Sequence, residues 1–208
     1  MLPSGRITTG LAIATAVAFA LLWLGGWVPL AAAVAGFVPA RASGAFELVG
    51  SLPWWLTPLS ATLVHADWLH LGFNMLMLVV TGRFAEQAIG GAGLLVLYAI
   101  GAYAAALGQY LWEPTSDVAM IGASGAISAV VAVYALLYGQ RRASAIGPIP
   151  ARWVHVAWLA AGWICVQILI ALALSGQTMS IAIFAHIGGF LAGLALARPL
   201  LLWRYRRA

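Results

Sequence analysis

The chain has 208 residues, of which 64% are hydrophobic and only 7% are charged, against about 25% charged residues in an ordinary soluble domain. This composition excludes a soluble globular protein. The net charge of +5 comes from arginines scattered along the chain, and so sparse a distribution excludes a nucleic acid groove, which needs clustered phosphate contacts. The single cysteine, Cys165, excludes both a disulfide framework and a multi-cysteine metal site.

Six apolar runs are long enough to cross a membrane, at about 20 residues per span. They are Ile7–Val28, Asp67–Ile89, Gly91–Leu111, Met120–Tyr138, Trp153–Leu174 and Ser180–Leu202. The sequence therefore predicts an all-α membrane protein, a single domain over residues 1–208 with six transmembrane helices. The first run exceeds the apolar core of about 7–15 residues found in cleaved signal peptides, so we expect a retained anchor.

The arginines predict the orientation, because cytoplasmic loops carry an excess of positive charge. With six spans, only Arg41 falls on the side opposite to the termini. The side with both termini holds Arg6, Arg83, Arg141, Arg142, Arg152, Arg198, Arg204, Arg206 and Arg207. The side with Arg41 also holds four acidic residues, Glu47, Asp67, Glu113 and Asp117. We therefore expect both termini in the cytoplasm.

The segment from residue 39 to residue 64 falls on the outer side. It is too apolar for a simple turn and too interrupted by prolines to span the membrane. It also contains Trp54 and Trp55, and tryptophan favours the boundary between lipid and water. The sequence predicts an outer loop that lies partly in the outer leaflet.

Polar side chains in the second run are candidate functional residues, because they are costly inside a membrane. His70 and Asn74 share a helix face, His65 lies just ahead of them, and Asp67 is placed to cap the helix. Each of these side chains alone could instead join helices by hydrogen bonds. A metal site at His65 and His70 is a further alternative, but the segment has no acidic third ligand and no HExxH motif.

Two later runs carry a serine and a histidine among small residues. Ser124 lies in GASG at residues 122–125, and His186 shares a helix face with Gly189 and Gly193. Packing alone could explain such small residues, because they let helices approach closely. At 1.5 Å per residue, however, both side chains lie about 6–9 Å from the outer ends of their runs, at the depth of His70. We therefore expect Ser124 and His186 to meet, in the geometry of an activated nucleophile.

In these residues the chain resembles the rhomboid family of intramembrane serine proteases. The resemblance extends from His65 to the end of the sixth run. It rests on HADWLHLGFN from His65, on Gly82, Glu86 and Gly90 at fourfold spacing, on GASG around Ser124, and on AHIGGFLAG around His186. It implies a six-transmembrane-helix rhomboid bundle with a water-accessible cavity that opens outward.

The resemblance also implies a role for each matching residue. Ser124 would be the nucleophile, His186 the general base, and His70 and Asn74 oxyanion donors beside the backbone N–H of Ser124. His65 would order the first outer loop, and Glu86 would be a structural hydrogen-bonding residue. The structural residues expected near the site are His65, Gly122, Gly125, Gly189, Gly193 and Glu86. The family needs neither metal nor cofactor.

The chain departs from the family's pattern in two places. Ser128 stands where many rhomboids carry an aromatic residue that stacks on the catalytic histidine. The outer loop has Trp54-Trp55-Leu56 where the family tends to have a Trp-Arg pair. Neither change removes a group that takes part in the chemistry.

The sequence therefore favours an intramembrane serine endopeptidase that cleaves transmembrane segments of other proteins with a Ser-His dyad. We expect no cofactor, and a multi-pass location in a bacterial inner membrane with the site open to the periplasmic side. One alternative is a catalytically weak or inactive rhomboid-like protein that binds transmembrane helices, which Ser128 leaves open. Another is a small transporter or a bis-histidine haem protein that uses His65, His70, His155 and His186.

Overall fold

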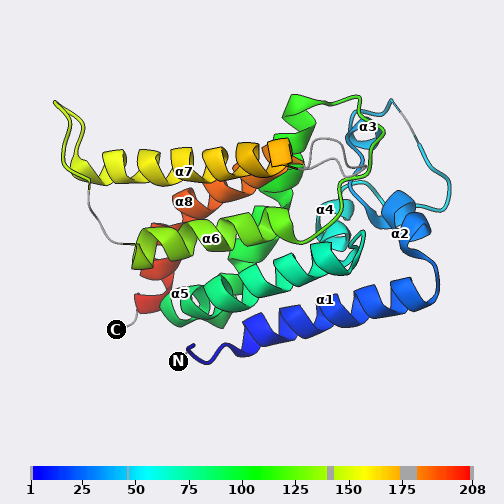
Figure 1. Cartoon of the computed structure of the whole chain (residues 1–208), viewed down its shortest axis with the longest axis horizontal. Helices are drawn as coiled ribbons and strands as arrows, with labels where there is room; N and C mark the ends of the chain where they lie inside the picture. The colour runs from blue at the N-terminus through cyan, green and yellow to red at the C-terminus, as the bar shows by residue number, and fades with distance from the viewer. Residues whose placement is uncertain (1, 46, 140–142, 174–181, 207–208) are drawn as a thin grey trace.

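Figure 1 shows the fold of the chain in a computed structural model that describes residues 2–45, 47–139, 143–173 and 182–206. The helices are α1 (Arg6–Leu24), α2 (Val28–Ala35), α3 (Pro39–Ala42), α4 (Thr57–Ser60), the 3₁₀ helix η1 (Ala61–Leu63), α5 (Trp68–Trp112), α6 (Ser124–Tyr138), α7 (Ala151–Ala173) and α8 (Ile183–Tyr205). About 74% of the chain is helical, and its described residues form no β-strand. The prediction of an all-α fold is confirmed.

Three of the described helices are long and apolar enough to cross a membrane, namely α1, α5 and α8. Helix α6 is apolar but shorter, with 15 residues. These helices make the chain a helical membrane bundle, as the composition predicts.

Helix α5 consists of two arms that join at Gly90. This residue has φ 78° and ψ 163°, and a positive φ suits glycine because it has no Cβ. Arg204 of α8 donates hydrogen bonds to the carbonyl oxygens of Glu86 (3.0 Å) and Gln87 (2.7 Å), where the first arm ends. A break falls at residue 90, between the second and third predicted runs.

Two predicted runs extend further toward the outer loops than the helices in the structure do. The first run was predicted to reach Val28, but α1 ends at Leu24 and Val28 begins the separate helix α2. The reason is the turn at Gly25 and Gly26, where Gly26 has a φ of 68°. The fourth run was predicted from Met120, but α6 begins at Ser124.

The last two runs agree more closely with the helices. Helix α7 begins at Ala151, two residues before the predicted Trp153, and α8 continues to Tyr205 instead of Leu202. The predicted ends at Leu174 and Ser180 lie outside the described residues.

The core of the bundle consists of α5, α6 and α8, with α1 beside the first arm of α5 and α7 against α8 (Figure 1). Helices α6 and α8 meet through the predicted small-residue faces. A Cβ added at Gly189 would collide with the carbonyl oxygen of Gly125, and one added at Gly193 would collide with that of Ala129. This close approach brings the two backbones into van der Waals contact.

The bundle has two distinct ends. The start of α1 and the end of α8 lie together at one end (Figure 1), which we call the terminal end. Helices α6 and α8 begin at the opposite end, beside the loop helices α2, α3 and α4. We call this opposite end the site end, because the candidate residues lie there.

Candidate active site

The structure brings Ser124 and His186 together. Ser124 is the first residue of α6, and His186 lies in the first turn of α8. The distance from Ser124 Oγ to His186 Nε2 is 2.7 Å, within the usual range of a hydrogen bond. Both side chains are partly buried. A hydroxyl and an imidazole 62 residues apart in the chain therefore form one pair.

The backbone just before Ser124 is held by the outer loop. Met120 and Phe37 exchange two backbone hydrogen bonds, of 2.8 and 3.0 Å, and Gly122 N donates to Ala61 O (2.9 Å). Gly122 has a φ of 105°, which an L side chain rarely adopts. This turn stops the helix from extending back to Met120, so Ser124 does not lie inside the run as predicted but at its start.

This position exposes Ser124 to the positive end of a helix. The first backbone hydrogen bond of α6 runs from Ile127 N to Ala123 O (2.9 Å). The N–H groups of residues 124–126 precede it and have no described acceptor. Free N–H groups and the helix dipole favour negative charge at a helix N-terminus. The electrostatics beside Ser124 Oγ therefore suit an anion.

His70 lies against the turn that leads to Ser124. A Cβ added at Gly122 would lie 2.6 Å from His70 Nε2, so only glycine leaves room for the ring. Asp67 caps α5 by accepting a hydrogen bond from His70 N (2.7 Å), as the sequence predicts. His70 Nδ1 accepts a long hydrogen bond from Ala66 N (3.4 Å). The cap and the glycine fix the position of the ring.

Asn74 is buried one turn further along α5. Its Nδ2 donates to the backbone oxygen of His70 (2.8 Å), and its Oδ1 is buried without a described hydrogen-bond partner. None of the described hydrogen bonds joins His70 or Asn74 to Ser124 itself. The oxyanion role of these two side chains thus stays a prediction.

His65 contacts the other side of the same turn. It is fully buried, and its Nε2 accepts a 3.4 Å hydrogen bond from Ala123 N. Its ring lies edge to face with that of His70, at a centroid distance of 4.9 Å. His65 precedes α5, and burial lowers its pKa to about 4, with a smaller lowering from His70. A neutral His65 therefore links the outer loop to the residue before Ser124.

Ser128 lies one turn after Ser124 in the contact between α6 and α8. It is 1% exposed, and its Oγ donates to the carbonyl oxygen of Ser124 (2.7 Å). A Cβ added at Gly189 would lie 3.4 Å from Ser128 Cβ. The small side chain thus fits the close approach of the two helices.

Glu86 lies at the terminal end, away from Ser124. Its Oε1 accepts from Ile7 N (3.0 Å), and its Oε2 accepts from Thr8 N (2.8 Å) and from the Thr8 hydroxyl (2.7 Å). The carboxylate therefore binds the first turn of α1. The sequence marks Glu86 as structural but carries no signal for this partner, 78 residues away.

The four histidines do not form one cluster. His155 is buried in the first turns of α7, a helix that begins on the side of the terminal end (Figure 1). His65 and His70 contact the turn that leads to Ser124, and His186 contacts Ser124 itself. Within the described ranges, no three His, Cys, Asp or Glu side chains are grouped as metal ligands are.

The site as a whole has the parts of a nucleophilic centre on a bundle of membrane helices. A serine hydroxyl contacts an imidazole, and helix N–H groups lie beside the hydroxyl. This combination is the one that serine hydrolases use on unrelated folds.

The chain belongs to the rhomboid family, because the family model described as the Rhomboid domain matches residues 53–203. It is similar to Rhomboid protease AarA of Providencia stuartii, with 37% identity over 92 residues, or 38% of this chain and 32% of that protein. It is also similar to Putative rhomboid protease YdcA of Bacillus subtilis, with 36% identity over 83 residues, or 39% and 40% of the two chains. Rhomboid-like protein 11 of Arabidopsis thaliana chloroplasts is 32% identical over 101 residues, or 49% and 36%. The matches thus span only about a third to two fifths of these relatives.

Proposed function

We propose that this protein is an intramembrane serine endopeptidase with Ser124 as nucleophile and His186 as general base. The single observation that carries the proposal is the 2.7 Å contact between Ser124 Oγ and His186 Nε2. Membership of the rhomboid family supports it, and two of the relatives are named as rhomboid proteases.

In the proposed reaction, His186 Nε2 takes the proton of the Ser124 hydroxyl while Oγ attacks the carbonyl carbon of a peptide bond. The imidazolium then gives this proton to the leaving amine, and a water molecule hydrolyses the acyl-enzyme by the reverse use of the same base. The N–H groups at the start of α6, together with His70 and Asn74, are the proposed donors to the oxyanion. No carboxylate is needed in this scheme, which is therefore a dyad.

We propose that the chain crosses the membrane six times, through α1, the two arms of α5, α6, α7 and α8. Both termini would then be cytoplasmic, and the site would open to the periplasmic side of a bacterial inner membrane. The length of α6 supports this arrangement. Its 15 residues span about 22 Å, less than the hydrocarbon thickness of about 30 Å. Ser124 at its start would thus lie below the outer membrane surface.

The proposed substrate is a transmembrane segment of another membrane protein. An intact helix hides its carbonyl groups in its own hydrogen bonds, so the scissile region must unwind before Oγ can reach it. Substrates with glycine, proline or other small residues near the outer end of their helix are therefore expected to be favoured.

Ser128 supports a second candidate, a rhomboid-like protein that binds transmembrane helices with little or no cleavage. Its hydroxyl bonds to the backbone of Ser124 and supplies no ring to hold His186. The two candidates differ in whether Ser124 reacts.

The test uses purified wild type and Ser124→Ala protein, each incubated with a fluorophosphonate probe and with a single-pass model substrate. We expect labelling at Ser124 and defined fragments by mass spectrometry for wild type, and at least a thousandfold slower cleavage for Ser124→Ala. A folded wild type that binds the substrate but is neither labelled nor active would reject the protease in favour of the binding protein.

A further inference from the structure

His186 lies in the first turn of its helix, which has no side-chain cap. Helix α8 begins at Ile183, and its preceding residue, Ala182, provides no side-chain cap. The backbone hydrogen bond from His186 N to Ala182 O, at 3.2 Å, is at the very start of the helix. Helix ends fray because their first N–H groups have no partner within the helix. Something else must hold this turn if the imidazole is to stay at 2.7 Å from Ser124 Oγ.

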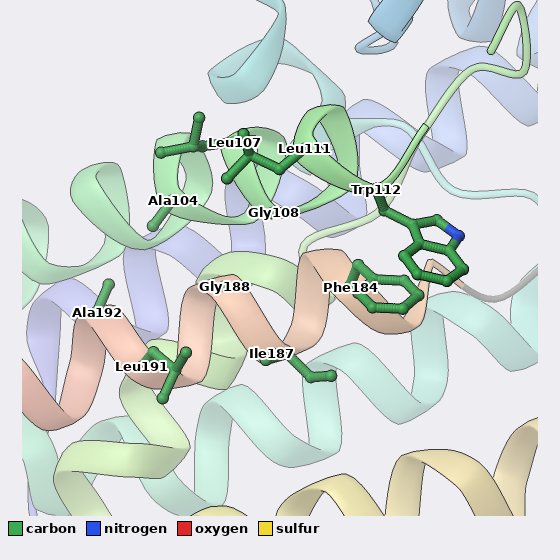
Figure 2. A pocket seen from close by; sticks show the side chains of 10 residues that line it. All are labelled: Ala104, Leu107, Gly108, Leu111, Trp112, Phe184, Ile187, Gly188, Leu191 and Ala192. Atoms are coloured by element: carbon green, nitrogen blue, oxygen red, sulfur yellow. The ribbon is translucent and has the colours of Figure 1, made fainter. Parts of the chain in front are cut away.

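An aromatic stack holds the turn from the side. Phe184 of α8 stacks on Trp112, the last residue of α5, with ring centroids 3.8 Å apart and an interplanar angle of 12°. This centroid distance is the shortest of any aromatic pair among the described residues. Figure 2 shows the two rings face to face at one end of a groove of about 470 Å³ between α5 and α8.

The backbones beneath the stack are also in close contact. A Cβ added at Gly108 of α5 would collide with the carbonyl oxygen of Phe184, and one added at Gly188 would collide with that of Ala104. The first turn of α8 is therefore pressed onto α5 on the side that carries Phe184. Residues two apart point in nearly opposite directions on a helix, at about 200°. The stack thus supports the back of the turn whose other side carries His186.

We propose that Phe184 and Trp112 form a clamp that positions His186 toward Ser124. Both are positioning residues, because neither touches Ser124 in the described contacts. The inference rests on the proposed function, since it assigns the clamp a part in the reaction of that same pair. It also supplies aromatic support for the turn of His186 in a chain that has Ser128 in place of a ring.

The test compares the variants Phe184→Leu and Trp112→Ala with wild type. Trp112 is 62% exposed, so its loss leaves the core of the bundle intact. Each variant is expected to lower kcat and the rate of fluorophosphonate labelling of Ser124 by roughly three- to tenfold, with KM unchanged. The kcat of the double variant should be no lower than that of the less active single variant, because either change alone removes the whole stack.

Rescue and a matched control separate positioning from general packing. Phe184→Tyr and Trp112→Phe keep two stacked rings and should keep at least half of the wild-type kcat. Leu191→Ala removes a side chain of the same groove that is 52% exposed and lies two turns further along α8, and it should leave kcat unchanged. Equal losses in Leu191→Ala, or wild-type labelling rates in both clamp variants, would overturn the proposal.

Amide hydrogen exchange tests the clamp without any need for activity. Exchange of the His186 amide, which bonds to Ala182 O, and of the amides in the next turn of α8 should be faster in Phe184→Leu and Trp112→Ala than in wild type, and unchanged in Leu191→Ala. If wild type shows no labelling but this pattern of exchange is found, the clamp stands and the proposed protease function fails. If wild type is active and exchange does not change in the clamp variants, the clamp fails alone.

Discussion

The two ends of the bundle are held together by different kinds of contact. At the terminal end, the Glu86 carboxylate accepts three hydrogen bonds of 2.7–3.0 Å from α1, and Arg204 donates two of 2.7 and 3.0 Å to the end of the first arm of α5. At the site end, His65 and His70 each accept one hydrogen bond of 3.4 Å. Charged partners make hydrogen bonds about twice as strong as neutral ones.

The contacts that stabilise the fold are therefore largely different from those that position the site residues. The five hydrogen bonds of Glu86 and Arg204 join α1, the first arm of α5 and α8 at the terminal end. Around Ser124 one charge-assisted bond, from His70 N to the Asp67 carboxylate (2.7 Å), caps α5, and close packing of glycines and aromatic rings supplies most of the other contacts. A neutral imidazole can accept a proton, as the proposed general base must. Changes at the site end should therefore chiefly alter activity, with a smaller effect on stability, and changes at the terminal end should chiefly alter stability.

After Ser124→Ala, the largest expected effect at the site end is that of Asn74→Ala. If Asn74 donates to the oxyanion, its loss should lower kcat by roughly ten- to a thousandfold. Its Oδ1 has no described partner and its Nδ2 bonds only to the backbone oxygen of His70 in the preceding turn (2.8 Å), so the free energy of unfolding should fall by only about 1 kcal/mol. Cleavage kinetics and thermal unfolding in the same detergent measure both quantities.

The control for Asn74 is Thr81→Val, on the same arm of α5. Thr81 also donates to the backbone oxygen four residues earlier, at 2.7 Å, and is also buried. A similar fall of kcat in Thr81→Val would show that the helix geometry, and not the amide, is responsible.

The long helices of the core could be predicted from the sequence because they consist of apolar runs, with α5 made of two runs that join at Gly90. The contact between α6 and α8 could also be predicted, since Gly189 and Gly193 share one face of α8 and Gly125 lies on the facing side of α6. The short helices α2, α3 and α4 were not predicted, because they depend on contacts such as that between Arg41 and the carbonyl oxygen of Leu52. The hydropathy of the sequence does not indicate such contacts.

The position of Ser124 at the start of a helix could not be predicted either. Residues 120–123 are as apolar as the helix that follows. The helix stops before them because Met120 pairs with Phe37, 83 residues earlier in the chain, and because Gly122 has a positive φ. The motif around Ser124 was recognisable, but the N–H groups beside its hydroxyl follow from tertiary contacts.

Glu86→Gln should show the contrasting effect at the terminal end. The amide keeps one acceptor oxygen but loses the negative charge that three donors share, so the free energy of unfolding should fall by about 3 kcal/mol. Labelling of Ser124 well below the unfolding temperature should keep its wild-type rate. Glu113→Gln, an exposed change beyond the end of α5, is the matched control and should alter stability by less than about 0.5 kcal/mol. Slower labelling in Glu86→Gln would contradict the separation of the two ends.

The smallest expected effect concerns His65 and pH. Its pKa in the folded protein is about 4, below the ordinary value of 6.5, so between these values the unfolded chain binds a proton that the folded chain does not. The stability that the neutral ring supplies is therefore complete above pH 6.5 and is lost as the pH falls toward 4. Between pH 7 and pH 5 the loss should be about 2 kcal/mol.

The variant His65→Gln isolates this loss, because glutamine does not titrate and its Oε1 can still accept from Ala123 N. Unfolding midpoints of wild type should fall from pH 7 to pH 5 more steeply than those of the variant. At pH 5 the two proteins should be closest in stability, since only wild type has lost the advantage of the neutral ring. Parallel curves would mean that protonation elsewhere, and not that of His65, controls the acid sensitivity.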